Sequence, residues 1–428
     1  MANKLHLETA LLADGWHRDV IITVERGIIS SVGTGDVAGA QRVSGIVLPG
    51  LPNVHSHAFQ RAMAGLTERR GSESDSFWTW REQMYRFVER LTPEGLEAIA
   101  ALAYTEMLEA GFTSVAEFHY LHHQPDGRPY DHVAEMSQRI VAAANEVGIG
   151  LTLLPVLYRQ GGFGGIPAAA AQRRFVCDRD LYARLMESKV PDGSVGIAPH
   201  SLRAVTLDDV KWAAATWPKA PAHIHISEQT IEVEQCLVAH GRRPIDLLMD
   251  TIEIDARWCL VHATHADGAE IARIAQSRAV VGLCPITEAN LGDGLFDVPA
   301  LLARGGRLGV GSDSNVRISA ADELRTLEYG QRLVHRRRNV LGEPSRSTGR
   351  RLFEAALDGR AIAAGQRADL VVLDDAGFRG DGVVDHWLFS GDNTAIKTVF
   401  CAGKPVVQSG RHVNRDAIAA RYAKALAA

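Results

Sequence analysis

Eight short apolar runs, separated by longer stretches with helical spacing, set the strongest limit on how this chain can fold. The runs cover residues 46–57, 112–120, 149–158, 194–201, 222–228, 258–265, 279–288 and 307–315. Strand-like segments that alternate with helix-like segments are typical of parallel βα units rather than of an all-β protein. Because eight such units close into a barrel, the sequence predicts an α/β fold built on a (β/α)8 TIM-like barrel.

The two ends of the chain depart from this pattern. Residues 5–35 have the character of short strands joined by glycine turns, and residues 365–374 and 396–411 have the same character. We therefore expect a small β-sandwich domain built from residues 1–45 together with 360–428. The barrel domain then spans residues 46–359.

Charge and cysteine content restrict the partners of the chain. It has 46 Lys and Arg against 51 Asp and Glu, and this net charge of -5 gives no long-range attraction to nucleic acid or to an anionic membrane. Its five cysteines are an odd number without CxxC spacing, which argues against a disulfide framework and a thiolate zinc site. No stretch of 18 apolar residues occurs. We expect a cytoplasmic protein that acts on a small molecule, with a homodimer as the commonest assembly of such proteins.

The histidines are clustered along the chain, since twelve of the 17 lie between residues 55 and 265. Several of them, and one aspartate, stand at the ends of predicted strands: His55, His57, His225, His262 and Asp313. Catalytic groups of such barrels lie at the carboxyl ends of the strands. Nitrogen and oxygen donors from four strand ends are what a mononuclear zinc or iron site needs, with one position left open for water.

This constellation resembles the amidohydrolase superfamily, and the resemblance covers essentially the whole chain. Members with two metal ions carry a carboxylated lysine at the fourth strand, where this chain has Gly-Ile-Ala-Pro-His at residues 196–200. The resemblance therefore implies one metal ion, Zn²⁺ with Fe²⁺ as the alternative. The HxxE spacing of His225 and Glu228 resembles the single-metal, deaminase-like branch, whose members hydrolyse C–N or C=N bonds at amidine-like carbons.

Five separated segments resemble the formimidoylglutamate deiminase family within that branch: HSHAFQRAMAGL, FWTWREQMY, EFHYLHH, PHSLRAV and GSDSN. The resemblance implies zinc-dependent hydrolysis of N-formimino-L-glutamate to N-formyl-L-glutamate and ammonia, a step of histidine degradation. The metal ligands that it implies are His55, His57, His225 and Asp313. The catalytic residues that it implies are Glu228, His262 and Asp313. The residues that it implies for substrate binding are Gln60, Arg81, Tyr120, His200 and Arg203.

The assumed substrate makes physical sense of these residues, because it carries an amidine at one end and two carboxylates. Guanidinium groups bind carboxylates through paired hydrogen bonds, which suits Arg81 and Arg203. A purine, guanine or pterin-type deaminase of the same superfamily is the alternative, since an aromatic substrate needs a flat apolar slot instead. A barrel that only binds or assembles is the third reading. We expect His223 to be a hydrogen-bonded core histidine.

Overall fold

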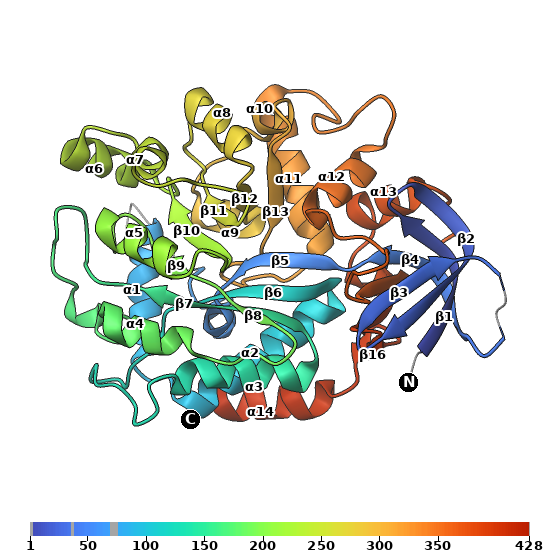
Figure 1. The fold of residues 1–428 in the computed structure, drawn as a ribbon, viewed down its shortest axis with the longest axis horizontal. Helices are drawn as coiled ribbons and strands as arrows, with labels where there is room; N and C mark the ends of the chain where they lie inside the picture. The colour runs from blue at the N-terminus through green and yellow to red at the C-terminus, as the bar shows by residue number, and fades with distance from the viewer. Residues whose placement is uncertain (1–2, 36–37, 69–75, 428) are drawn as a thin grey trace.

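The computed structural model describes residues 3–35, 38–68 and 76–427, and a barrel of parallel strands forms its centre (Figure 1). The sheet order is β10-β11-β12-β13-β5-β6-β7-β8, and β9 also pairs with β7. A parallel bridge between Ile197 and Ala222 joins the β9 side to β10 and closes the circle. The strands are β5 (Leu51–Ser56), β6 (Phe112–His119), β7 (Gly150–Leu157), β8 (Ser194–Val195), β9 (Ala198–Pro199), β10 (Ala222–Ile226), β11 (Trp258–His262), β12 (Val280–Leu283) and β13 (Arg307–Val310). The predicted TIM-like barrel is thus confirmed.

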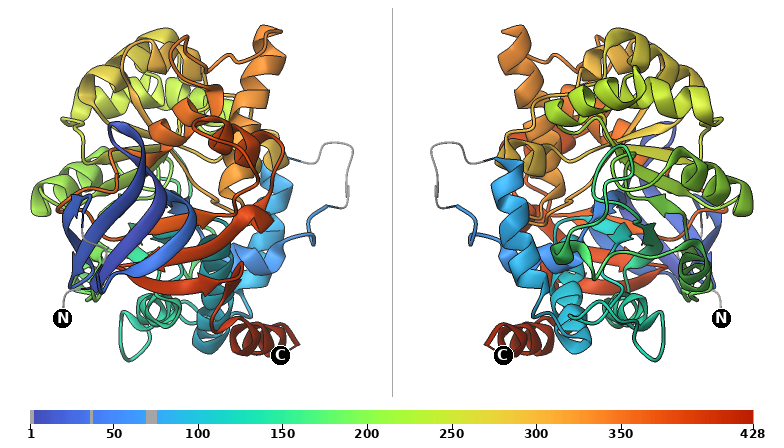
Figure 2. Two further views of the ribbon diagram at one scale, coloured as in Figure 1. Left: turned by 90° about the vertical axis from the view of Figure 1, so that its right-hand side faces the viewer. Right: turned by 90° about the vertical axis from the view of Figure 1, so that its left-hand side faces the viewer.

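Helices follow the strands and surround the barrel (Figures 1 and 2). Local sequence explains their ends: Asp267 accepts hydrogen bonds from the backbone of Ala269 and Glu270 and begins α8, whose Ile271 and Ile274 are buried. The barrel helices are α1 (Phe77–Val88), α2 (Pro93–Glu109), α3 (Glu135–Val147), α4 (Arg179–Met186), α5 (Leu207–Thr216), α6 (Thr230–His240), α7 (Pro244–Thr251), α8 (Gly268–Ser277), α9 (Pro285–Leu291), α10 (Val298–Leu302), α11 (Ala320–His335) and α12 (Thr348–Leu357). No helix in the described ranges has the length and apolar character needed to cross a bilayer.

A second sheet combines both ends of the chain. Its order is β17-β16-β15-β14-β4-β1-β2-β3, with β4 and β14 paired antiparallel at its middle. Its strands and the remaining helices are β1 (Asn3–Leu12), β2 (Gly15–Glu25), β3 (Ile28–Gly33), β4 (Gln41–Pro49), β14 (Leu370–Leu373), β15 (Ile396–Cys401), β16 (Lys404–Gln408), β17 (Arg411–His412), α13 (Gly382–Phe389) and α14 (Arg415–Ala427). A sandwich arrangement of this sheet stays a prediction.

Two of the eight apolar runs are each divided between two strands, and a third, 279–288, contains β12 and the first residues of α9. The run 46–57 is divided between β4 and β5, which belong to different sheets, and the break lies at Gly50. A Cβ atom on Gly50 would lie 2.3 Å from side-chain atoms of Thr113, so only glycine allows the chain to pass there. The run 194–201 is likewise divided at Gly196, where a Cβ atom would lie 2.7 Å from the carbonyl oxygen of Pro221. Both contacts join segments distant in sequence.

Candidate active site

Three buried histidines form a compact cluster at the carboxyl ends of the barrel strands. β5 carries His55 and leads into His57 on the same face, because side chains two residues apart on a strand point the same way, and β10 carries His225. The Nε2 atom of His55 lies 3.1 Å from Nε2 of His57 and 3.0 Å from Nε2 of His225. The Oδ1 atom of Asp313, which follows β13, lies 3.6 Å from His55 Nε2 and 3.4 Å from His57 Nε2. Four side chains from three strands thus face one point.

Hydrogen bonds from the Nδ1 atoms fix the orientation of the His57 and His225 rings. His57 donates from Nδ1 to the carbonyl oxygen of Phe118 at 2.8 Å, and His225 donates from Nδ1 to that of His200 at 3.1 Å. The Nε2 atoms of both rings therefore present lone pairs to the cluster. Burial lowers the pKa of His57 to about 3 and holds the pKa values of His55 and His225 well below the usual range. Neutral imidazoles and one carboxylate are a fitting donor set for a single Zn²⁺ or Fe²⁺ ion.

The loop after β13 is held in place by a buried asparagine. Asn315 donates from Nδ2 to the carbonyl oxygens of Asp313 at 3.0 Å and His57 at 3.1 Å. Its Oδ1 accepts a hydrogen bond from the hydroxyl of Ser312 at 2.6 Å. Both Asp313 and Asn315 have positive φ angles, 43° and 55°, so this network stabilises a backbone conformation that carries strain. Asn315 thereby fixes the position of the Asp313 carboxylate relative to β5.

A second group of charged side chains lies beside the cluster. His262, the last residue of β11, donates from Nδ1 to Oε1 of Glu288 at 3.1 Å. Its Nε2 lies 3.9 Å from Oε1 of Glu228 and 3.8 Å from Oδ2 of Asp313. Burial opposes protonation of His262, but the carboxylates of Glu228, Glu288 and Asp313 outweigh it and raise its pKa to about 10. A protonated histidine at this place can donate a proton or stabilise negative charge.

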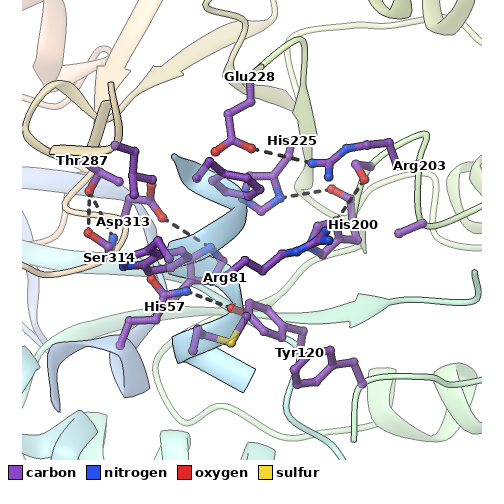
Figure 3. A pocket seen from close by; sticks show the side chains of 18 of the residues that line it. His57, Arg81, Tyr120, His200, Arg203, His225, Glu228, Thr287, Asp313 and Ser314 are labelled. Carbon is purple, nitrogen blue, oxygen red and sulfur yellow. Dashed lines mark hydrogen bonds and ion pairs between the residues drawn. The ribbon is translucent and has the colours of Figure 1, made fainter. Parts of the chain in front are cut away.

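A pocket of about 730 Å³, its open mouth included, lies over these groups. Figure 3 shows side chains from several strand ends converging on it, among them His225, Glu228, Arg203 and Asp313. The five residues predicted to bind substrate all line it, namely Gln60, Arg81, Tyr120, His200 and Arg203. Of the predicted metal and catalytic residues, His57, His225, Glu228, His262 and Asp313 line it as well. The structure therefore brings these residues into one site, with His55 in direct contact with the cluster.

The two arginines of the pocket differ in their partners. Arg203 Nη2 lies 3.8 Å from Glu228 Oε2, and its Nε lies 3.8 Å from Glu232 Oε2. Arg81 extends from α1, and its guanidinium carbon lies 4.4 Å from the centre of the Trp78 ring. Arg81 forms no ion pair with any carboxylate in the described part of the chain. A cation in a pocket that has no anionic partner among the described residues favours an acidic ligand.

Sequence reasoning missed several residues of the site. Glu288 is the last residue of the seventh apolar run, but the structure places it on α9 rather than at the strand end that the run predicts. Glu232 supports Arg203 from α6, one helical turn after Glu228. Phe77, Tyr85 and Ser314 lie in the quoted segments FWTWREQMY and GSDSN but were not singled out there. The other missed lining residues include Tyr158, Phe175 and Thr287. His223 is buried as expected, but neither of its ring nitrogens has a hydrogen-bond partner among the described residues.

Comparison with known proteins places the chain in a family. The model of the amidohydrolase family matches residues 46–406. The chain belongs to the amidohydrolase family. It is 50% identical to the formimidoylglutamate deiminase of Pseudomonas aeruginosa over 447 aligned positions, which cover 99% of each protein. It is 28% identical to the 8-oxoguanine deaminase of the same organism, over 78% of this chain and 76% of that protein.

Solved structures agree with this assignment. An amidohydrolase from Brucella melitensis superposes with a TM-score of 0.96 at 47% identity, with 99% of each chain covered. An adenosine deaminase from Xanthomonas campestris, solved with bound zinc, has a TM-score of 0.80 at 21% identity and covers 99% of this chain and 96% of that one. The second likeness shows the fold alone. Members of the superfamily use a metal centre, and the group of His55, His57 and His225 could hold a metal ion in this chain.

Proposed function

We propose that this amidohydrolase hydrolyses the formimino C=N bond of N-formimino-L-glutamate and releases N-formyl-L-glutamate and ammonia. A relative of this name that is 50% identical over the full length supports the proposal. The observation that carries it in the structure is that one pocket holds a metal-type cluster, Arg203, and Arg81, which has no carboxylate partner among the described residues. The amidine of such a substrate matches the metal-type cluster, and its two carboxylates match the arginines. A neutral purine would instead leave the Arg81 cation without a partner.

We propose Zn²⁺ as the ion, held by His55, His57, His225 and Asp313. When bound, it acts as a Lewis acid that lowers the pKa of water toward neutrality. Hydrogen bonds from Nδ1 of His57 and His225 to backbone carbonyls fix the rings with Nε2 facing inward. Such outer hydrogen bonds set ring orientation and strengthen the nitrogen as a ligand.

Glu228 moves the proton in this proposal. Its carboxylate lies between two cationic groups, with Arg203 at 3.8 Å and His262 at 3.9 Å, and it is not one of the ligands proposed above. It accepts a proton from the attacking water and delivers it to the formimino nitrogen. It then carries the remaining hydroxyl proton to the same nitrogen, so that the C–N bond breaks, the formyl C=O bond forms and ammonia leaves as a neutral molecule. His262, held by Glu288, stabilises the negative charge on the attacking oxygen.

The substrate carboxylates bind to the arginine side of the pocket. Arg81 and Arg203 offer guanidinium groups, and Gln60 donates to the hydroxyl of Tyr120 at 2.9 Å. That bond occupies one lone pair of the Tyr120 oxygen and leaves its hydrogen free to donate to a ligand. His200 lies next to Tyr120, with ring centres 6.0 Å apart.

Product analysis tests this proposal. The zinc-loaded protein is incubated with N-formimino-L-glutamate, and the products are quantified by proton NMR and an ammonia assay. We expect one equivalent of N-formyl-L-glutamate for each equivalent of ammonia. Ammonia released from guanine, adenosine or a pterin, with N-formimino-L-glutamate left intact, would establish the alternative.

We further propose a cytoplasmic homodimer. All five cysteines are free and buried, which is typical of proteins from reducing compartments. Light scattering in solution tests the assembly, with an expected mass of about twice the 46.4 kDa of one chain. A mass equal to one chain would contradict the dimer.

A further inference from the structure

Two tyrosines in the pocket wall have no part in the reaction described above. Tyr85 belongs to α1, and Tyr158 directly follows β7. Both line the pocket that contains Arg81 and Arg203. A buried glutamine, Gln172 at the end of the short helix η2 (Ala170–Gln172), bridges them. Its Nε2 lies 2.6 Å from the hydroxyl oxygen of Tyr158 and 3.1 Å from that of Tyr85.

The hydrogen bonds of Gln172 determine where the two phenolic hydrogens point. Its Oε1 accepts the backbone N–H of Ala169 at 2.8 Å, which fixes the amide with its nitrogen toward the tyrosines. An amide nitrogen has two hydrogens and no lone pair to offer, so both tyrosine oxygens must accept. Each phenolic hydrogen therefore points away from Gln172. Within the described ranges, neither hydroxyl has an acceptor for its hydrogen.

The same pocket contains two cations. The guanidinium carbon of Arg81 lies 5.6 Å from the centre of the Tyr85 ring. The guanidinium of Arg203 shares the pocket and lies 5.8 Å from the Trp78 ring that Arg81 also covers. Two hydroxyl donors that share a pocket with two guanidinium groups are suited to bind an anion.

The position of Tyr158 relative to the metal cluster indicates which part of a bound ligand it contacts. The ring centre of His200 lies 5.0 Å from that of His225, a proposed metal ligand, and 4.8 Å from that of Tyr158. Contacts thus lead from the metal cluster through His200 to Tyr158 and then through Gln172 to Tyr85. In N-formimino-L-glutamate, the side-chain carboxylate is the anionic group farthest from the amidine carbon.

We propose that Tyr85 and Tyr158 donate hydrogen bonds to the side-chain carboxylate of the substrate, beside Arg81, and that Gln172 is a positioning residue which turns both hydroxyls toward it. This inference rests on the proposed function. It assigns the preference for a dicarboxylic substrate to a pair of neutral donors as well as to the arginines. Neutral donors with a fixed direction favour a planar carboxylate over other polar groups.

Substitution of the tyrosines tests the donors. Tyr85→Phe and Tyr158→Phe are compared with wild type for binding of the product N-formyl-L-glutamate by calorimetry and for KM with N-formimino-L-glutamate. Loss of one hydrogen bond to a charged group is expected to weaken binding about 10- to 100-fold and to raise KM more than it lowers kcat. Tyr329→Phe, a surface tyrosine, is the matched control.

A ligand without the side-chain carboxylate separates recognition from a loss of pocket shape. N-formyl-L-norvaline has the same chain length but ends in a methyl group. We expect the Phe variants to bind it within about twofold of wild type. Equal losses for both ligands, or no loss for N-formyl-L-glutamate, would overturn the inference. Failure of the wild-type protein to convert N-formimino-L-glutamate at all would instead reject the proposed function.

Gln172→Glu tests the positioning role. The carboxylate has nearly the same shape but accepts hydrogen bonds, so it turns both phenolic hydrogens away from the ligand. We expect the affinity for N-formyl-L-glutamate to fall at least tenfold. Adding Gln172→Glu to the Tyr85→Phe/Tyr158→Phe double variant should then cost little more, because the donors are already absent. An equal loss in both backgrounds would mean that the new charge itself repels the ligand, and would contradict the positioning role.

Discussion

Glu228 is the side chain on which the chemistry of this site depends most. Replacing it with glutamine keeps the shape but removes the proton acceptor beside Arg203 and His262. We expect Glu228→Gln to lower kcat by about 10²- to 10⁴-fold. Zinc content should stay at one ion per chain, because Glu228 is not a proposed ligand.

The control for this variant is Glu234→Gln, an exposed glutamate on α6, the helix that follows the Glu228 loop. It should have wild-type kinetics and wild-type zinc content. Turnover by Glu228→Gln at the wild-type rate would refute the proton-transfer role, and loss of zinc from it would mean that the carboxylate holds the ion.

Buried neutral histidines predict how stability changes with pH. Burial lowers the pKa of His122 to about 3, from an ordinary value of 6.5, and its Nε2 donates to the carbonyl oxygen of Val156 at 2.9 Å. Below pH 6.5 the unfolded chain takes up this proton while the folded chain does not, so stability falls between pH 6.5 and about 3. By pH 5.5 one such histidine costs about 1.4 kcal/mol relative to neutral pH.

Urea unfolding of the metal-free protein at pH 7.5 and 5.5 measures this effect without interference from ligand binding. His122→Gln should lose less stability than wild type over this range, by about 1.4 kcal/mol. An identical pH dependence of the two proteins would show that His122 titrates normally in the folded state.

Among single side chains, the sequence reveals those that stand at strand ends. The strand-end rule located His55, His57, His225, His262 and Asp313, because alternation along a strand and the parallel order of the barrel bring such residues together. Tyr85, Tyr158 and Gln172 belong to α1, the end of β7 and the short helix η2, which meet only in the fold. No local sequence pattern connects the three residues, so their hydrogen bonds could not be predicted from the sequence.

The loop after β13 shows how an element positions the chemistry. Asn315 links Asp313 to His57 through backbone carbonyls. We expect Asn315→Ala to weaken zinc binding about 10- to 100-fold, as is typical when a group that orients metal ligands is removed. Competition with a chelator measures the affinity, and Asn339→Ala, at an exposed site, is the control. Unchanged affinity would mean that the loop keeps its shape without Asn315.

The strands themselves were largely predictable, and the exceptions have a common cause. Hydrophobic runs located every barrel strand. The runs at 46–57 and 194–201, however, are each interrupted in the structure, at Gly50 and at Gly196. At these breaks the glycines lie against Thr113 and Pro221, which come close only when neighbouring strands pair. Local periodicity contains no information on such contacts, so the sequence could not separate β4 from β5.

In the whole molecule, the metal cluster joins strands that lie far apart in sequence, because His55, His225 and Asp313 come from β5, β10 and the end of β13. An ion bound there stabilises the folded state over the unfolded chain, by about 2.7 kcal/mol when its free concentration is 100 times Kd. We therefore expect chelation to lower the thermal midpoint and added Zn²⁺ to restore it. His225→Ala should show a much smaller response to the chelator, and an equal response in both proteins would place the ion elsewhere.

A comparison of substrates by kcat/KM examines the function of the zinc-loaded protein directly. The panel contains N-formimino-L-glutamate, N-formimino-L-norvaline, guanine and adenosine, with ammonia release as the common signal. We predict that N-formimino-L-glutamate reaches a kcat/KM of about 10⁴ M⁻¹s⁻¹ or more, the range of dedicated enzymes, and exceeds every other compound. A higher value for guanine or adenosine, or no ammonia from N-formimino-L-glutamate, would contradict the proposed function.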